Sequence, residues 1–227
     1  MRLGLGRALL ALAVTMSVAA CGSEAGSTSP PDTAVETPVA PSTTTTVTIP
    51  TTAVLVDFAD PASIDGWRSV DDSVMGGISR STTSWSEGRL LFQGLMTTEN
   101  NGGFTSTIGP ADRALGAAAT GAVALGVDAI GDGRTYVLQV RAGPAGGELW
   151  IARFTPATSG VGDAATVSVP VSSFSPVDRF LRPRVASGPL DPSTIVQLAI
   201  YLIDGQVGQF RLAVRAITAE RQAGPRS

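Results

Sequence analysis

The chain lacks several residue types on which enzyme chemistry commonly depends. It contains no His and no Lys, so all 16 basic side chains are Arg, and its one Cys is Cys21. Without His there is no Ser–His or Cys–His dyad and no imidazole metal ligand, and without Lys there is no Schiff base. Carboxylates, hydroxyls and Arg remain, so among common mechanisms only carboxylate-pair chemistry such as glycoside hydrolysis survives this filter.

The charge balance argues against another class of partner. Residues 1–20 contain two Arg and no acid, so the remaining chain carries 14 Arg against 19 acidic side chains, a formal net charge of −5. A protein that binds nucleic acid irrespective of its sequence needs a basic surface. We therefore expect no nucleic-acid partner.

The N-terminal segment predicts export. Arg2 and Arg7 form a positive n-region, and the apolar run from Ala8 to Ala20 is too short to span a bilayer comfortably. Small residues then precede Cys21, as in a bacterial lipobox. We expect a lipoprotein signal peptide over 1–20, acyl chains such as palmitate on Cys21, and a location on the extracytoplasmic side of the cell membrane. A cleavable signal with a chance Cys is the alternative.

The rest of the chain divides by composition. Residues 21–52 are rich in Ser, Thr, Pro and Ala and lack the large apolar residues that would repay the entropy of ordering. We predict a disordered, flexible tether there, one folded domain over 53–219 and a disordered tail over 220–227. A domain of that size buries about 70% of its unfolded surface, so it needs neither a metal nor a disulfide.

Within the folded part, the pattern is that of β-structure. Strand-like runs cover 54–58, 89–95, 104–108, 123–130, 136–141, 149–154, 167–169, 195–203 and 210–215. Ile195 to Ile203 is apolar on both faces, as in a central strand, and Ala111 to Ala119 could form a turn of helix. Short strands separated by Gly and Pro turns predict an all-β sandwich or barrel.

Two stretches with a glycine doublet stand out. The first runs from Trp67 to Arg80 and the second from Glu99 to Phe104. Glycine permits positive φ and close approach of another backbone, and Asp and Asn fix turns through nearby amides. We predict two structured loops that share one end of the domain. The candidate binding residues are Trp67, Asp71, Asp72, Met75, Gly76, Gly77, Arg80, Glu99, Asn100, Asn101, Gly102 and Gly103.

These stretches also carry a family resemblance. Val70 to Arg80, Phe92-Gln93-Gly94 and Glu99 to Phe104 resemble the complex I intermediate-associated protein 30 family. Further matches are Gly131 to Tyr136, Val169-Pro170-Val171 before Phe174, and Gly208 to Leu212. The resemblance covers about 53–219 and implies a galactose-binding-like, jelly-roll-like β-sandwich, related in shape to carbohydrate-binding modules. Mitochondrial members are assembly factors for respiratory complex I.

The carboxylates of the two stretches allow several interpretations. Asp71 and Asp72 are adjacent, so in extended backbone they point to opposite faces, which is poor geometry for an acid–base pair. Together with Glu99 they are weak candidates for a Ca²⁺ site. The alternative, which is our hypothesis, is a clasp between the two loops in which Arg80 or Arg68 neutralises Glu99. We assign no metal, no cofactor and no catalytic residue.

Several other side chains are candidates for a binding surface. Trp67, Trp85 and Trp150 could stack on sugars. The alternation around Trp150 favours the core, whereas Trp85 lies in a polar stretch and is expected to be exposed. Met75 is expected to plug the end of the sandwich. The basic cluster Arg179, Arg182 and Arg184 is interpreted as a solvated loop, with an acidic patch on a partner as the alternative.

These observations lead to three functional hypotheses. The first is a non-enzymatic, lipid-anchored binding or assembly module that acts as a protein-binding accessory to a membrane complex. The second is a carbohydrate-binding module for cell-wall or environmental glycans. The third, which has the least support, is a glycosidase or lyase that uses carboxylates alone.

Overall fold

The computed structural model describes residues 51–143, 147–158, 165–185 and 188–222. The chain divides after Thr45 into two units, and everything described here belongs to the second. The predicted signal peptide, Cys21 and most of the predicted tether lie outside the described residues, as does the end of the predicted tail. Among the described residues, no helix has the length and apolar character needed to cross a bilayer.

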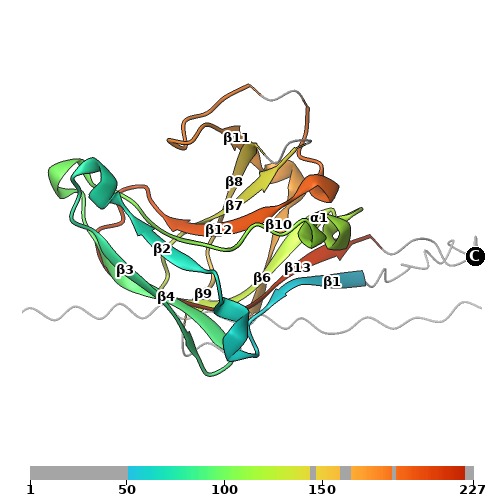
Figure 1. Cartoon of the computed structure of the whole chain (residues 1–227), viewed down its shortest axis with the longest axis horizontal. Helices are drawn as coiled ribbons and strands as arrows, with labels where there is room; N and C mark the ends of the chain where they lie inside the picture. The colour runs from blue at the N-terminus through green and yellow to red at the C-terminus, as the bar shows by residue number, and fades with distance from the viewer. Residues whose placement is uncertain (1–50, 144–146, 159–164, 186–187, 223–227) are drawn as a thin grey trace, which may run out of the picture. The chain divides into compact units, whose positions relative to one another are not determined.

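The described domain is a β-sandwich, as predicted (Figure 1). Its seven-stranded sheet has the order β10-β6-β13-β4-β3, with β1 beside β13 and β9 beside β6, and its six-stranded sheet has the order β11-β8-β7-β12-β5-β2. The strands are β1 (Thr51–Asp57), β2 (Arg68–Asp71), β3 (Arg80–Ser86), β4 (Arg89–Met96), β5 (Thr105–Ile108), β6 (Ala124–Gly131), β7 (Tyr136–Ala142), β8 (Glu148–Phe154), β9 (Ala157–Thr158), β10 (Ala165–Pro170), β11 (Ser175–Val177), β12 (Gln197–Leu202) and β13 (Gly208–Arg221). The strands therefore begin and end slightly outside the predicted boundaries of 53 and 219.

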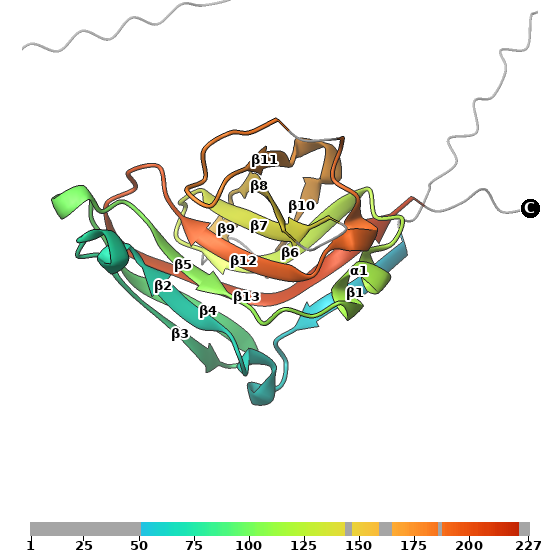
Figure 2. The same cartoon turned by 45° about the horizontal axis from the view of Figure 1, so that its top comes forward.

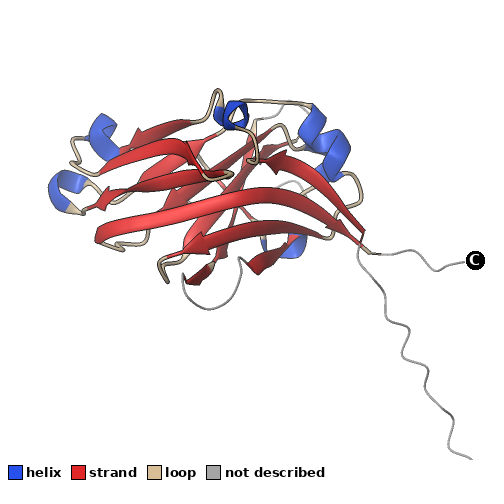
Figure 3. Cartoon of the chain, turned by 90° about the horizontal axis from the view of Figure 1, so that it is seen from below, coloured by secondary structure: helices blue, strands red, loops and turns tan. Residues whose placement is uncertain are grey.

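Helical segments are short and lie at the ends of strands (Figure 3). They are the α-helix α1 (Ala114–Ala119) and the 3-10 turns η1 (Pro61–Ile64), η2 (Asp72–Met75), η3 (Glu99–Asn101), η4 (Val171–Ser173) and η5 (Pro192–Thr194). The predicted turn of helix is thus present as α1. Its Gly116 lies so close to η5 that an added Cβ would be 2.2 Å from the carbonyl oxygen of Ser193. The glycine that weakens this helix also lets it pack.

Alternating side chains from both sheets form one core. In β7, Tyr136, Leu138 and Val140 point into it, as predicted. In β13 the pairing with β6 shifts register between Val214 and Ala216, which marks a β-bulge. The bulge changes the phase of the alternation, so Leu212 and Val214 before it and Ile217 after it are all buried. This change of phase keeps the long strand facing the core over most of its length.

The first glycine-doublet stretch is more regular than a loop. It contains β2, η2 and the start of β3, and β2 and β3 are edge strands of different sheets that lie side by side (Figures 1 and 2). Between the sheets, the hydroxyl of Thr83 is 2.9 Å from that of Ser69 and donates to that of Thr107 over 2.9 Å. At this edge hydroxyl groups therefore join the two sheets.

Candidate functional site

One buried carboxylate joins the two glycine-doublet stretches. The side chain of Asp72 is 0% exposed. Its Oδ1 accepts the backbone N–H of Ser79 (3.0 Å), and its Oδ2 accepts the hydroxyl of Ser79 (2.6 Å) and the backbone N–H groups of Gly103 (2.8 Å) and Phe104 (3.4 Å). We call this network the Asp72 clasp.

The Asp72 clasp favours the ionised carboxylate. Burial by itself would raise the pKa of Asp72, because it penalises the charged form. The hydrogen bonds from the Ser79 hydroxyl and from the amides of Gly103, Ser79 and Phe104 outweigh burial and hold the pKa of Asp72 below its ordinary value. The charge is thus compensated by dipoles that the fold itself positions.

The adjacent carboxylate has a separate partner. Asp71 accepts the backbone N–H of Ser81 over 2.9 Å and the Ser81 hydroxyl over 2.5 Å. Ser81 lies in the edge strand β3, so Asp71 satisfies a backbone donor at the edge of the sheet. Asp71 and Asp72 therefore turn to different donors, in line with their expected divergence.

Each glycine doublet divides two tasks between its members. Gly76 and Gly103 have positive φ, +90° and +141°. Gly77 and Gly102 are instead at points of close approach, where an added Cβ would be 2.3 Å from the carboxyl carbon of Asp72 and 2.6 Å from its Oδ2, respectively. One glycine of each pair turns the chain, and the other leaves room for the buried carboxylate.

The expected ion pair of Glu99 is not observed. Among the described residues, the ion pairs are Arg134–Asp132, Arg153–Asp204 and Arg215–Asp128. Glu99 is exposed in η3, where Asn100 and Asn101 both have positive φ. This turn directs its side chains to solvent, so the hypothesis that Arg80 or Arg68 neutralises Glu99 was wrong. The two stretches are joined by Asp72 instead.

The weak metal candidates do not come together. Within the described residues there is no group of three or more Asp, Glu, His or Cys that could hold a metal ion. Asp71 and Asp72 are bound to different hydrogen-bond donors, and Glu99 lies at the surface.

The three Trp side chains are used mainly for packing. Trp67 is partly buried and meets Phe58 edge-on, with 5.3 Å between ring centroids. Trp85 was expected to be exposed, but it is also partly buried, and its indole N–H donates to the Phe58 carbonyl oxygen over 2.8 Å. Trp150 is buried in the core, as its alternation predicted.

Met75 does not plug the sandwich, contrary to our expectation. Its side chain is 53% exposed and that of Val74 is 78% exposed. Both belong to η2, which begins at the buried Asp72. Successive side chains of a 3-10 turn are about 120° apart, so burying Asp72 directs Val74 away from the interior. Met75 follows Asp72 by one full turn and is the last residue of η2.

The exposed side of η2 borders a groove on the outer face of the six-stranded sheet. Its volume is about 640 Å³. The lining residues are Val70, Val74, Met75, Phe104, Arg179, Phe180, Leu181, Arg182 and Tyr201. We call this the Phe180 groove. Two of its walls come from the glycine-doublet stretches, and another comes from the segment between β11 and β12.

A compact turn holds Phe180 in place. Oδ1 of Asp178 accepts the backbone N–H groups of Phe180 (2.7 Å) and Arg182 (3.0 Å). Leu181 adopts φ +59° and packs on an apolar cluster of the outer face, which leaves Phe180 51% exposed. The guanidinium carbons of Arg179 and Arg182 lie 4.7 and 5.2 Å from the centroid of the Phe180 ring. The turn thus presents one aromatic ring with two cations.

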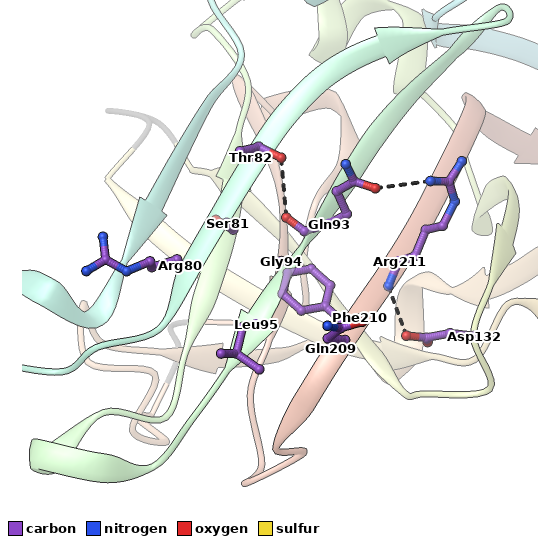
Figure 4. Close-up of a pocket in the computed structure, with 10 residues that line it drawn as sticks. All are labelled: Arg80, Ser81, Thr82, Gln93, Gly94, Leu95, Asp132, Gln209, Phe210 and Arg211. Carbon is purple, nitrogen blue, oxygen red and sulfur yellow. Dashed lines mark hydrogen bonds between the residues drawn. The ribbon is translucent and has the colours of Figure 1, made fainter.

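A second, shallow hollow lies on the outer face of the seven-stranded sheet, with a volume of about 560 Å³ (Figure 4). Its polar groups bind one another. Arg211 donates through its side chain to Oε1 of Gln93 and through its backbone N–H to Oδ2 of Asp132, both over 3.0 Å. Arg80, a predicted binding residue, projects from the edge of this hollow and not from the Phe180 groove.

Asp132 and Glu87 line a neighbouring hollow of about 390 Å³, but Asp132 is part of a structural lock. Its Oδ1 accepts the hydroxyl of Tyr136 (3.1 Å), and burial and the charge of Asp132 raise the pKa of that tyrosine. Arg134 donates to the carbonyl oxygens of Gln206 and Gln209, each over 2.8 Å. The Gly131 to Tyr136 motif therefore ties the β6–β7 turn to the β12–β13 turn.

The sequence analysis did not identify the residues that complete the Asp72 clasp and the Phe180 groove. Ser79 was not singled out, although a serine seven residues after a turn aspartate is available as its partner. Phe180 and Tyr201 were also missed, because neither belongs to a glycine-rich motif. One signal for Phe180 was present: Asp178 precedes it by two residues, the spacing of an Asx turn that exposes the side chains at its tip.

Solved structures with the same fold come from carbohydrate-binding proteins. The family 11 carbohydrate-binding module of the cellulosomal cellulase Lic26A-Cel5E of Clostridium thermocellum is 19% identical, with a TM-score of 0.53, and the match covers 74% of this chain and 94% of that one. The family 11 module from Clostridium thermocellum in complex with a β-1,3-1,4-mixed-linked tetrasaccharide is 20% identical, with a TM-score of 0.52 and the same coverage. At sequence identities of 19% and 20%, this structural similarity establishes a shared fold and no shared function.

The sequence itself gives a closer assignment. No curated protein matches the chain. The family model for complex I intermediate-associated protein 30 matches residues 56–214, a span that contains both glycine-doublet stretches, the Asp72 clasp and the hydrogen bonds of Arg134 to the β12–β13 turn. The chain therefore belongs to the complex I intermediate-associated protein 30 family.

Proposed function

We propose that this protein is a non-catalytic docking module that holds a segment of a partner protein in the Phe180 groove. The family and the fold are those of binding modules. The observation that carries the proposal is the composition of the groove, which combines exposed Phe, Met and Val side chains with two Arg. Aromatic residues, Met and Arg are the residue types enriched at protein interfaces.

The exposure of the groove residues is costly unless a partner covers them. Val74, Met75 and Phe180 are each more than half exposed, and all three border one hollow. Contiguous exposed apolar surface with a polar rim is typical of interaction sites in proteins. The rigid Asp178 turn and the Asp72 clasp fix the opposite walls, so little ordering is required on binding.

We further propose that the module is exported and anchored to the extracytoplasmic face of the cell membrane through acyl chains on Cys21. The lipobox-like sequence before Cys21 supports this location, and the Ser-, Thr- and Pro-rich segment up to residue 52 provides a tether. Several acyl chains anchor a protein firmly, at about 0.8 kcal/mol for each buried CH₂. The partner would then be a protein complex of the same membrane, in keeping with the first hypothesis above.

Site-specific photo-crosslinking in native membranes tests the docking function. A photoactivatable phenylalanine analogue is placed at position 180 in the full chain and, as the matched control, at position 185. Val185 is 94% exposed in the same segment but does not line the groove. We expect a discrete crosslinked protein from position 180 and none from position 185. Equal crosslinking from both positions, or none from either, would refute docking in the groove.

Glycan binding is the second candidate, and the likeness to a module solved with a tetrasaccharide favours it. The aromatic rings of Phe104, Phe180 and Tyr201 in the groove could contact a sugar. Calorimetric titration of the full mature chain with the β-1,3-1,4-mixed-linked tetrasaccharide separates the two candidates. Saturable heat that Phe180→Ala abolishes would support the glycan, whereas the docking function predicts no heat.

A further inference from the structure

Positive charge collects around the Phe180 groove beyond the two Arg that line it. Tyr201, on the groove floor, is partly buried, and burial raises the pKa of its hydroxyl. Arg141 in β7 and Arg68 in β2 oppose that rise, because both place a positive charge near the hydroxyl. Arg179 and Arg182 therefore line the groove itself, and Arg68 and Arg141 lie near the hydroxyl of Tyr201, one of its lining residues.

These charges lack acidic partners in the part of the chain that the structure describes. None of Arg68, Arg141, Arg179 and Arg182 belongs to an ion pair within 4.0 Å, although three other Arg do. Among the described residues, no carboxylate lines the groove. Asp178 belongs to the same turn, and its pKa is lowered by the Arg182 and Phe180 amides and by the charges of Arg182 and Arg179. Its Oδ1 is already engaged by the turn.

This arrangement is unfavourable for the isolated chain. Arg179 and Arg182 carry like charges, yet both are held over the Phe180 ring. Contact with the ring face leaves the guanidinium N–H groups available in the plane of each cation, where they can bind a carboxylate in bidentate fashion. The net charge of the mature chain is −5, so the chain as a whole repels an acidic partner, and the cations of the groove supply a local attraction.

We propose that the groove recognises an acidic segment of a partner protein, with carboxylates on Arg179 and Arg182 and an apolar side chain between Phe180 and Met75. This inference rests on the proposed docking function and adds the chemistry of the partner. A protein segment fits better than a purely anionic ligand, because it supplies both the apolar anchor and the carboxylates.

Fluorescence anisotropy with defined peptides tests the charge preference on the full mature chain. The probes are a labelled peptide of alternating Leu and Glu and its Leu–Gln counterpart. We expect the Leu–Glu peptide to bind at least about tenfold more tightly at low salt, with a preference that shrinks as NaCl screens the charges. Equal affinities for the two peptides would overturn the proposal.

Paired substitutions separate local recognition from net charge. Arg179→Gln with Arg182→Gln removes the two cations that line the groove and should abolish the preference for Leu–Glu. Arg80→Gln with Arg113→Gln removes two exposed cations elsewhere, gives the same net charge and should retain the preference. A similar loss in both variants would mean that only overall charge matters, which contradicts the proposal. Circular dichroism confirms that each variant is folded.

A further experiment tests whether the chain's own tether occupies the groove. The predicted tether contains Glu24, Asp32 and Glu36 and no basic residue. The full-length variant Glu24→Gln, Asp32→Asn, Glu36→Gln removes these three charges. If it bound the Leu–Glu peptide at least about tenfold more tightly, the tether would be the segment that occupies the groove. That result would overturn the proposal of a partner segment. Unchanged affinity supports the partner.

The crosslinking assay at position 180 distinguishes failure of this inference from failure of the docking function. If the variant with Arg179→Gln and Arg182→Gln still yields the same crosslinked protein at unchanged intensity, docking stands and the acidic preference is wrong. If the unsubstituted chain yields no crosslink, the docking function fails. Loss of the crosslink in the Gln variant alone supports both.

Discussion

The Asp72 clasp and the Phe180 groove are neighbours built in opposite ways. In the clasp, a fully buried carboxylate receives four hydrogen bonds from Ser79, Gly103 and Phe104. In the groove, apolar side chains and cations face solvent, and no acid of the described part of the chain lines the surface. The clasp is satisfied within the chain, whereas the groove is not. The comparison indicates that the inward residues of the glycine-doublet stretches serve the fold, and we propose that their outward residues serve binding.

One short turn connects the two regions. Because η2 begins at the buried Asp72 and ends at the exposed Met75, the carboxylate that anchors the turn also fixes the position of the segment that carries Val74 and Met75. The second stretch behaves in the same way, since Gly103 donates to Asp72 and the next residue, Phe104, lines the groove. The stability of the clasp therefore determines the shape of two groove walls.

Removing the clasp carboxylate is expected to have the largest effect. Asp72→Ala leaves the Ser79 hydroxyl and three backbone amides without their acceptor, and should lower the free energy of unfolding by about 3 kcal/mol. Chemical denaturation measures it. Glu99→Gln is the matched control, because Glu99 is exposed and unpaired with Arg80 or Arg68, and it should change stability by less than about 0.5 kcal/mol. A larger loss for Glu99→Gln would restore the ion-pair hypothesis.

The division of tasks within a glycine doublet predicts the next largest effect. Gly77→Ala places a Cβ against the Asp72 carboxylate and should cost about 2 kcal/mol of stability. Gly103→Ala meets no atom within 4 Å but must adopt positive φ, so about 1 kcal/mol is expected. Thermal or chemical unfolding of both variants ranks them. The reverse order would show that backbone conformation, and not room for Asp72, dictates these glycines.

The fold was largely predictable, because it depends on patterns within single strands. Alternation placed Tyr136, Leu138 and Val140 in the core, and the family resemblance gave the sandwich. The site was less predictable, because it depends on which strands become neighbours. The identity of the clasp carboxylate required knowing that Gly103 returns to Asp72. Phe180 and Tyr201 belong to different elements and line the same groove only in the folded chain.

Acid should weaken the clasp and leave the groove less affected. The pKa of Asp72 is below its ordinary value of 3.8 in the folded chain, so the unfolded chain binds more protons as the pH falls. The ionised Asp72 carboxylate therefore stabilises the folded chain fully at pH values above its ordinary pKa. This contribution to the free energy of unfolding is lost as the pH falls through the lower pKa of the folded chain. In denaturation at a series of pH values, the stability gap between the unsubstituted chain and Asp72→Asn should narrow in strong acid. A constant gap would contradict the account.

Substitution in the groove should have the smallest effect on stability. Phe180→Ala removes a side chain that is half exposed, so the free energy of unfolding should change by about 0.5 kcal/mol or less, although docking is lost. Chemical denaturation measures the free energy of unfolding. Crosslinking from position 74, at the opposite wall of the groove, measures docking. A loss of stability as large as that of Asp72→Ala would mean that Phe180 is part of the core and not of a binding surface.

Methionine oxidation tests the division between clasp and groove most directly. After residue 20 the chain contains two Met, of which Met75 is 53% exposed in the groove and Met96 is 0% exposed in the core. Peroxide treatment and mass spectrometry give both oxidation rates, in the purified chain and in native membranes. We predict that Met75 is oxidised rapidly in the purified chain and several-fold more slowly in membranes, where a partner covers the groove. Phe180→Ala should abolish this protection of Met75. Met96 should become reactive only in Asp72→Ala, in which the clasp is lost. Equal oxidation of Met75 in both settings would contradict the account.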